Sequence, residues 1–552
     1  MTSNCRIHYR LGIPLEEGKY PGHGYSRRFE HGLLIERDVP VTMRDGVRLY
    51  VDVFRPANQE GPLPVILSYS PYGKHGRKSV QMFGHDTESN PAMDVGPLSH
   101  YTVWEGPDPL FWCEQGYVVV NADTRGSWGS EGTLTFYSPE EARDGYDVVE
   151  WCGAQTWSNG RVGMSGVSYL ASSQWGVGST KPPSLKAINP WEGASDPYRD
   201  RAMHGGMLET RFRPWWIESA GYSRTRVEDV YEMAVNHPLY DEYWESRAAR
   251  LAEIDVPLYA VVGWGDHGIH TRGTIEGFKQ AASEDKWLEV HGQFKWPYFY
   301  RPESLERQAA FFAAYLKDGT EPFTRPRVTI EVRDQHRTGE VRGESDWPLP
   351  ATEYQCAYLD ANRGNLSFDA ATATGIVAVE VELGSAVFEM TFDRDTELTG
   401  NTALKLFVHT DDADDIDLFV GLEKLDRAGE KVGFAFQSIY SDGPVALGWL
   451  RASHRELDPE RTTTAQPWHT HRRELPVPRG EVVEVEVEIL PSSTLFRAGE
   501  TLRLVVQGRE LYPYPGDPVV IVHDQTRNVG SFHLHTGGDT PSHLVLPVIP
   551  RS

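Results

Sequence analysis

The sequence lacks any run of about 18 consecutive apolar residues, the length that a helix needs to cross a membrane. Positive charge is also scarce, because 54 Lys and Arg face 79 Asp and Glu and the formal net charge is −25. A chain this acidic repels phosphate groups, so nucleic acids and anionic membranes are poor partners for it. We therefore expect a small-molecule substrate, with no nucleic-acid and no membrane partner, and leave homo-oligomer formation open.

Cysteine is rare, and the four cysteines do not form close pairs. Cys5, Cys113, Cys152 and Cys356 lie far apart, which is not the spacing of a zinc site or a redox motif. We expect neither a metal nor an organic cofactor. The first ten residues carry His and Arg without an apolar core, unlike a secretory signal, so we expect a cytoplasmic protein.

Short apolar runs, each ending in turn residues, recur through the first part of the chain, with helix-like segments such as 139–152 and 271–283 between them. The runs are continuous rather than alternating, which suits strands that are buried on both faces. Strands separated by helices predict a parallel sheet that is covered by helices. The expected strands are residues 65–69, 117–122, 162–164, 185–188, 258–262 and 287–290.

Two departures from this pattern divide the chain further. Residues 196–254 are polar, aromatic and helix-like, and they form either a cap over an active site or a decoration without a catalytic role. After about residue 319 apolar and polar residues alternate strictly, as in 483–489, which indicates an antiparallel sandwich. The predicted units are an α/β core in 1–195 and 255–318, a helical cap in 196–254 and a β-sandwich in 319–552.

A serine nucleophile is indicated by Gly166-Val167-Ser168, which lies between a predicted strand and a helix-compatible segment. A tight turn here would hold the Ser168 hydroxyl at the top of the sheet, beside a helix N-terminus. The N–H of Tyr169, directly after the serine, would then point at a developing oxyanion. Leu170 replaces the second glycine of the usual G-x-S-x-G pattern, so a structural turn serine is the alternative.

A serine nucleophile needs a base and an orienting carboxylate. Asp266 follows a predicted core strand, at the strand end where the acid of an α/β-hydrolase belongs. His291 immediately follows the last predicted core strand and lies on the same rim of the sheet, so it is the expected base. His267 adjoins the acid in sequence and would point elsewhere, and His270 fits a loop or the start of a helix. These two histidines are the next candidates for the base.

Longer motifs accompany these single residues along nearly the whole chain from about Val39. They are Met43-Arg44-Asp45-Gly46, Ser70-Pro71-Tyr72-Gly73-Lys74, Asp123-Thr124-Arg125-Gly126, Trp157-Ser158-Asn159-Gly160, Gly166-Val167-Ser168-Tyr169, Gly263-Trp264-Gly265-Asp266 and Gly448-Trp449-Leu450-Arg451. Together they resemble the motifs of the cocaine esterase and X-prolyl dipeptidyl aminopeptidase family of α/β-hydrolases. The resemblance implies an α/β-hydrolase core, a helical cap and a C-terminal jelly roll.

The resemblance also implies roles for single residues. Ser168 would be the nucleophile, Asp266 the triad acid, and Tyr72 an oxyanion donor that acts with the Tyr169 N–H. The family's histidine base normally lies in a G-P-W-x-H motif after the last core strand. Here Lys295 or Trp296 occupies that place, depending on the alignment, so either His291 serves from a shifted position or the triad is incomplete.

Together these features predict a serine hydrolase that cleaves small carboxylic esters or amides through an acyl-enzyme. An X-prolyl dipeptidyl aminopeptidase would need a carboxylate for the substrate ammonium, for which Glu192 or Asp196 is a candidate unless both are surface charges. Acyl transfer to an acceptor other than water is a further alternative, as is a binding protein with a degraded triad. The candidates for a substrate pocket are Trp191, Trp215, Trp216 and Trp264.

Overall fold

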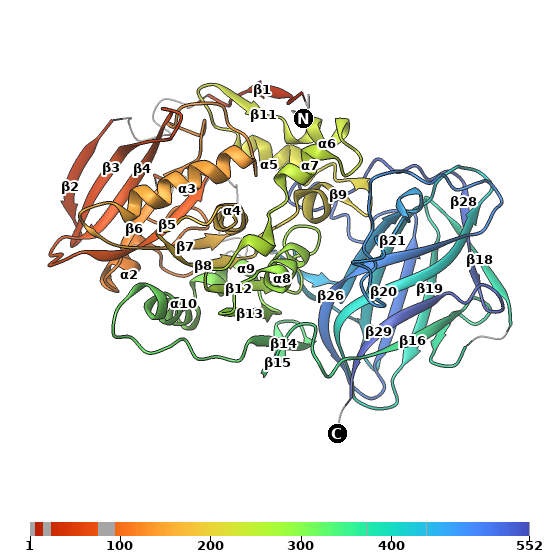
Figure 1. The fold of residues 1–552 in the computed structure, drawn as a ribbon. Helices are drawn as coiled ribbons and strands as arrows, with labels where there is room; N and C mark the ends of the chain where they lie inside the picture. Colours follow the sequence, from red (N-terminus) through yellow and green to blue (C-terminus); the bar gives the residue numbers. More distant parts are fainter. Residues whose placement is uncertain (1–5, 15–23, 76–93, 371–372, 438, 551–552) are drawn as a thin grey trace.

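The centre of the fold is a twisted sheet whose inner strands are parallel (Figure 1). The computed structural model describes residues 6–14, 24–75, 94–370, 373–437 and 439–550. Antiparallel strands flank the parallel ones at both edges. In spatial order the strands are β2 (Ser26–Glu30), β3 (Leu33–Thr42), β4 (Arg48–Pro56), β6 (Val118–Asp123), β5 (Leu63–Ser70), β7 (Ser158–Val167), β8 (Leu185–Trp191), β12 (Leu258–Gly263), β13 (Lys286–His291), β14 (Val328–Gln335) and β15 (Thr338–Glu344).

Each strand expected from a continuous apolar run is present in this sheet. In β6, Val118 and Val120 belong to one hydrophobic cluster and Val119 to another, because alternate side chains of a strand point to opposite faces. Both faces are therefore buried, and β6 contains no exposed position. This burial explains why the runs are continuous rather than alternating.

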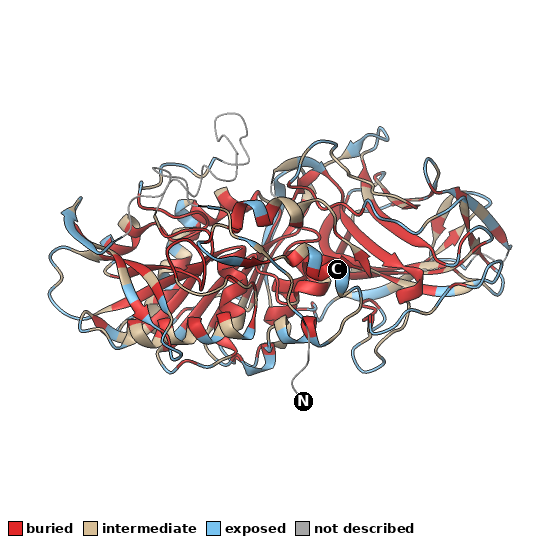
Figure 2. Ribbon diagram, turned by 90° about the horizontal axis from the view of Figure 1, so that it is seen from above, coloured by how far each residue is buried: buried red, intermediate tan, exposed pale blue. Residues whose placement is uncertain are grey.

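Helices cover both faces of the sheet. The first cluster contains side chains from α3 (Pro139–Gly153), α4 (Tyr169–Gly178) and α8 (Thr271–Gln280). The second contains side chains from α2 (Pro109–Glu114) and α10 (Pro302–Leu316). Figure 2 shows the resulting buried interior along the whole molecule.

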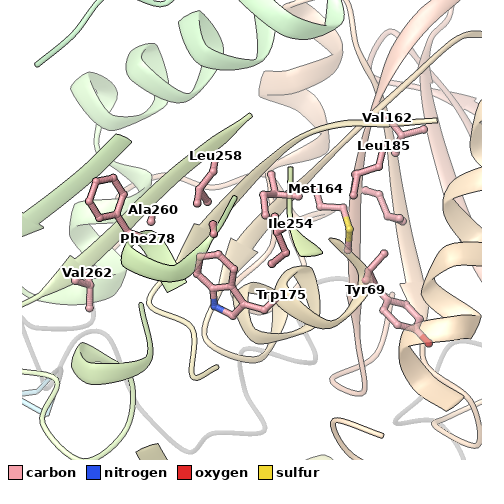
Figure 3. Packing of buried hydrophobic residues seen from close by; sticks show 14 of the residues in the cluster. Tyr69, Val162, Met164, Trp175, Leu185, Ile254, Leu258, Ala260, Val262 and Phe278 are labelled. Atoms are coloured by element: carbon pink, nitrogen blue, oxygen red, sulfur yellow. The ribbon is translucent and has the colours of Figure 1, made fainter. Parts of the chain in front are cut away.

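Trp175 of α4 packs against both α8 and the sheet. It is fully buried and lies among strand side chains such as Met164 and Leu258 (Figure 3). A Cβ added at Gly277 of α8 would lie 2.6 Å from the Trp175 indole. Glycine at this position lets α8 pack closely against α4.

The insertion between β8 and β12 contains short helices and strands rather than one long helix. β11 (Arg226–Glu228) pairs with the N-terminal strand β1 (Tyr9–Leu11), so the start of the chain is held against the insertion. The helical elements are η2 (Tyr198–Ala202), α5 (Phe212–Ala220), α6 (Val230–Asn236), α7 (Glu242–Arg247) and η3 (Leu251–Glu253).

The C-terminal part is a β domain whose pairings are nearly all antiparallel. In β26, Val485, Val487 and Ile489 are buried within its hydrophobic cluster, as their alternation with glutamate predicts. Among the described residues, no helix is long and apolar enough to cross a membrane. The main strands are β16 (Glu353–Asp360), β17 (Asn365–Ser367), β18 (Gly375–Glu380), β19 (Ser385–Thr391), β20 (Thr396–Thr410), β21 (Asp417–Leu425), β25 (Ala446–Arg451), β26 (Val483–Phe496), β27 (Thr501–Gln507), β28 (Ser531–Thr536) and β29 (His543–Ile549).

The core sheet continues beyond residue 319, where the sequence pattern placed the start of the second domain. β14 pairs parallel with β13, and β15 closes this edge as an antiparallel hairpin. The sheet therefore ends at Glu344. The prediction missed these strands because they follow a Pro-containing segment that resembles an interdomain linker.

Candidate active site

Ser168 lies in a sharp turn between β7 and α4. Its backbone has φ 61° and ψ −112°, a conformation that non-glycine residues rarely adopt outside strained functional sites. Its N–H donates to the carbonyl of Trp191 at 3.0 Å, which fixes the turn to the end of β8. Gly166, with φ 137°, makes the turn possible, because a Cβ there would lie 2.6 Å from Leu170.

The hydroxyl of Ser168 lies 3.1 Å from Nε2 of His270. Nδ1 of the same imidazole bonds to Oδ2 of Asp266, four residues earlier. Asp266 lies just beyond β12, and its carbonyl accepts the His270 N–H at 3.1 Å, so a tight turn brings the acid and the imidazole together. His270 is also the residue that precedes α8, and its side chain is buried.

His291, the base expected from the sequence, points elsewhere. Its ring stacks on Tyr298 with centroids 3.8 Å apart, and its Nε2 lies 3.3 Å from a carboxyl oxygen of Glu192. Among the described residues, no hydrogen bond joins His291 to Ser168. This geometry corrects the expectation that His291 is the base. His291 is the last residue of β13 and lies on the predicted rim of the sheet, but its side chain packs against α9 (Lys295–Tyr300).

The other runner-up, His267, is also excluded by geometry. It is fully buried, and its ring lies 5.9 Å from that of Phe436 in the C-terminal domain. The only sequence signal for His270 was an Asp-x-x-x-His spacing between a strand end and a helix start. That spacing is common in sequences, so it does not identify a base unless the structure shows the turn that brings the two side chains together.

Lys295 and Glu192 complete a buried group of ionisable side chains around Asp266. The Lys295 ammonium lies 3.3 Å from Oδ2 of Asp266. Burial opposes ionisation of Asp266, but Lys295 and then His270 outweigh it and hold the pKa of this carboxyl well below its usual range. Burial, followed by the charge of Asp266, raises the pKa of Glu192 well above its usual range, so Glu192 is a neutral acid.

Burial also lowers the pKa of His270 below its ordinary value, although Asp266 acts in the opposite direction. The imidazole is therefore neutral at pH 7 and able to accept a proton from Ser168. Glu192, Asp266 and His270 also offer potential metal-ligand atoms within 4.8 Å of one another. The Lys295 ammonium on the same Asp266 oxygen disfavours a metal cation there, because the two positive charges would repel each other.

Two groups could donate hydrogen bonds to an oxyanion beside Ser168. Tyr72, in the turn after β5, is buried, and its hydroxyl accepts the indole N–H of Trp216 at 3.0 Å. In that contact the Tyr72 oxygen is the acceptor, so the contact does not use the phenol proton. Burial raises the pKa of Tyr72 well above its usual range, so the phenol keeps its proton. Tyr169 is the first residue of α4, where backbone N–H groups lack helical acceptors.

The tryptophans expected to line a pocket occupy different environments. Trp216 stacks on Tyr169, with ring centroids 5.8 Å apart, and therefore borders the site. Trp215 is partly buried against Phe212. Trp191 is fully buried among Tyr259, Tyr298 and Phe299, and Trp264 is fully buried against Trp347 with its indole N–H on the Glu331 carbonyl. Trp191 and Trp264 therefore pack the core.

The chain matches two family models and several known proteins. Residues 45–293 match the X-Pro dipeptidyl-peptidase (S15 family) model, and residues 323–545 match the X-Pro dipeptidyl-peptidase C-terminal non-catalytic domain. A CocE/NonD family hydrolase from Staphylococcus aureus is 43% identical with a TM-score of 0.90, over 94% of each chain. The cocaine esterase of Rhodococcus sp. (strain MB1 Bresler) is 27% identical over 94% of this chain and 99% of its own.

A more distant solved structure supports the fold. An α-amino acid ester hydrolase has a TM-score of 0.69 at 17% identity, over 97% of this chain and 99% of its own. The matches extend over the hydrolase core and the C-terminal β domain together, as the sequence motifs implied. The chain therefore belongs to the cocaine esterase and X-prolyl dipeptidyl-peptidase family of α/β-hydrolases, and it is a serine hydrolase of ester or amide bonds.

Proposed function

We propose that Ser168, His270 and Asp266 form the catalytic triad that cleaves small carboxylic esters or amides. The observation that carries this proposal is the continuous contact from Ser168 Oγ to His270 Nε2, at 3.1 Å, and from His270 Nδ1 to Asp266. This is the arrangement of nucleophile, base and orienting acid that acyl transfer to a serine requires. The acid and base come from one turn, rather than from two separate loops.

In the first half-reaction Ser168 Oγ bonds to the carbonyl carbon while its proton passes to His270 Nε2. The carbonyl oxygen becomes an oxyanion, which accepts hydrogen bonds from the Tyr72 hydroxyl and the Tyr169 N–H. His270 then protonates the leaving alcohol or amine as the bond to carbon breaks. In the second half, water loses a proton to His270, attacks the acyl-enzyme and releases the acid as Ser168 regains its proton.

We infer that residues 196–254 form a helical cap and that the C-terminal β domain is a jelly roll. The cap inference is supported by Trp216 of α5, which contacts both Tyr72 and Tyr169. The jelly-roll inference is supported by antiparallel strands around one hydrophobic cluster. Both assignments agree with a site that is open to small substrates only, because the Ser168 residue is 9% exposed.

An ester substrate is favoured over an X-prolyl peptide. The two carboxylates considered for an ammonium site are both engaged, because Glu192 faces Asp266 and Asp196 pairs with Arg199 at 2.7 Å. A short-chain aryl ester and a dipeptidyl anilide, assayed side by side, separate the two activities. Faster turnover of the anilide would contradict the ester preference.

A fluorophosphonate probe tests the triad directly. We expect the wild type to be labelled at Ser168, and Ser168→Ala and His270→Ala to lose labelling. His291→Ala serves as the matched histidine control and should remain labelled at more than half the wild-type rate. Full labelling of His270→Ala together with loss in a correctly folded His291→Ala would overturn the proposed base.

A further inference from the structure

Two buried arginines of the insertion between β8 and β12 have no carboxylate partner within the part of the chain that the structure describes. Arg201, in η2, and Arg213, in α5, are each 6% exposed. Among the described residues, neither forms an ion pair, and Nε of Arg201 and Nε and Nη1 of Arg213 have no hydrogen-bond partner. An unpaired buried charge is costly, so a protein keeps one mainly where a ligand supplies the opposite charge.

Ser172, one helical turn after Ser168 in α4, links Arg201 to the turn that carries the nucleophile. Nη2 of Arg201 donates to the Ser172 hydroxyl at 3.2 Å, and that hydroxyl donates to the carbonyl of Ser168 at 3.0 Å. Nη1 of Arg201 bonds to the hydroxyl of Tyr137, whose ring lies against that of Tyr169 with centroids 4.7 Å apart. These contacts hold the guanidinium in place and leave Nε free for an acceptor.

The charge of Arg201 reaches the groups around the nucleophile. Burial dominates the pKa of His270 and of Glu105, but Arg201 acts on both, which places it within electrostatic range of the base. Arg213 also acts on Tyr137, although burial dominates the pKa of that phenol, and the charge of Arg201 adds to burial in lowering the pKa of Arg213. Two cations around one phenol form a site for an anion.

The nearby carboxylates neutralise these cations only in part. Glu105 accepts the indole N–H of Trp296, and burial raises the pKa of Glu105 to about 7. Glu209 accepts the backbone N–H groups of residues 211, 212 and 213, and burial raises its pKa to about 7 as well. At that pKa each acid is about half protonated near pH 7, and among the described residues neither forms an ion pair with Arg201 or Arg213.

We propose that Arg201 and Arg213 bind a carboxylate carried by the substrate, so that the enzyme prefers esters or amides that bear a carboxylate near the reacting carbonyl. This inference rests on the proposed function and names the substrate class of the same site. Arg201 contacts Ser172, which lies one helical turn, about 5.4 Å, from Ser168, so the carboxylate belongs a few bonds away from the carbonyl carbon, as in a monoester of a short dicarboxylic acid. Arginine suits this role because its planar fork matches a carboxylate.

Matched ester pairs test the preference on the wild type alone. Mono-4-nitrophenyl glutarate is compared with its methyl ester, and 4-acetoxybenzoate with methyl 4-acetoxybenzoate, at pH 7.5. We expect kcat/KM for at least one anionic ester to exceed that of its neutral partner by about 10- to 100-fold, the effect of one or two charge-assisted hydrogen bonds. Ratios at or below one for both pairs would overturn the proposal.

Variants then locate the preference. In Arg201→Gln and Arg213→Gln we expect the ratio to fall toward one, with most of the change in KM for the anionic ester. Arg211→Gln is the matched control, because it removes the same charge from the same segment but its side chain contacts Pro513 and Asp524 of the C-terminal domain. A ratio that falls equally in Arg211→Gln would show a general charge effect and contradict the site.

Glutarate binding separates this inference from the catalytic one. We expect glutarate to raise the Tm of the wild type more than glutaramide does at the same concentration, and to lose this effect in Arg201→Gln. This measurement requires no turnover, so it tests the anion site even if fluorophosphonate labelling of Ser168 fails. An equal shift with glutarate and glutaramide would contradict the site while leaving the triad intact.

Discussion

The Lys295 ammonium lies 3.3 Å from Oδ2 of Asp266, the oxygen that also bonds His270 Nδ1. Lys295 is one of the two residues that occupy the place of the family's usual histidine base. A counter-ion of Asp266 therefore lies at one of the two positions where the resemblance implies the base. We interpret Lys295 as a charge that keeps Asp266 ionised while His270 is the proposed base.

Neutralising Lys295 should shift the pH dependence of catalysis. The Lys295 charge is among the influences that lower the pKa of His270, so its removal in Lys295→Met raises that pKa. Because the neutral imidazole is the active form, the ascending limb of kcat/KM should move to higher pH. Lys295→Arg keeps the charge and is the control. An unchanged limb in Lys295→Met would exclude electrostatic coupling between Lys295 and the base.

The wild-type profile should begin its rise at low pH. Burial lowers the pKa of His270 below its ordinary value near 6.5, so the imidazole remains neutral, and active, as the pH falls through 6.5. We expect kcat/KM for a neutral aryl ester to be flat from pH 6.5 to 8, with the protein folded throughout by intrinsic fluorescence. An ascending limb centred at or above pH 7 contradicts this prediction.

Asp266 and Glu192 should respond very differently to replacement by an amide. Asp266→Asn removes the charge that orients His270 and should lower kcat by about 10³- to 10⁴-fold. Glu192→Gln replaces a neutral acid by a neutral amide of the same shape, because burial keeps the Glu192 pKa well above its usual range. We expect kcat within about threefold of wild type there, since no charge changes. A loss in Glu192→Gln as large as that in Asp266→Asn would show that Glu192 is ionised.

Lys74 should be important for the stability of the turn that carries Tyr72. The buried ammonium pairs with Asp38 at 2.7 Å and with Asp123 at 3.2 Å. Lys74→Met removes the ammonium group from these buried carboxylates, and we expect a loss of about 3–5 kcal/mol in the free energy of unfolding. Urea unfolding measures it. Lys186→Met on the surface is the control, expected within about 0.5 kcal/mol of wild type.

The sequence alone determined the core architecture and two members of the proposed triad. The core strands are recognisable because burial on both faces requires continuous apolar runs, and α3 and α8 begin where their patterns predict. Ser168 and Asp266 stand out because each follows such a strand directly, in a glycine-containing turn. These signals are local, so no knowledge of the folded chain is needed to read them.

The tertiary structure decided which histidine contacts Ser168 and what surrounds it. His291 and His270 both lie near the expected rim, but side-chain direction depends on the turn after β12 and on the packing of α9. Arg201 and Arg213 belong to an insertion that ordinary sequence patterns describe only as polar and aromatic. Only the folded structure shows that these two arginines form no ion pair among the described residues, because whether a charge is paired depends on contacts between segments that are distant in sequence.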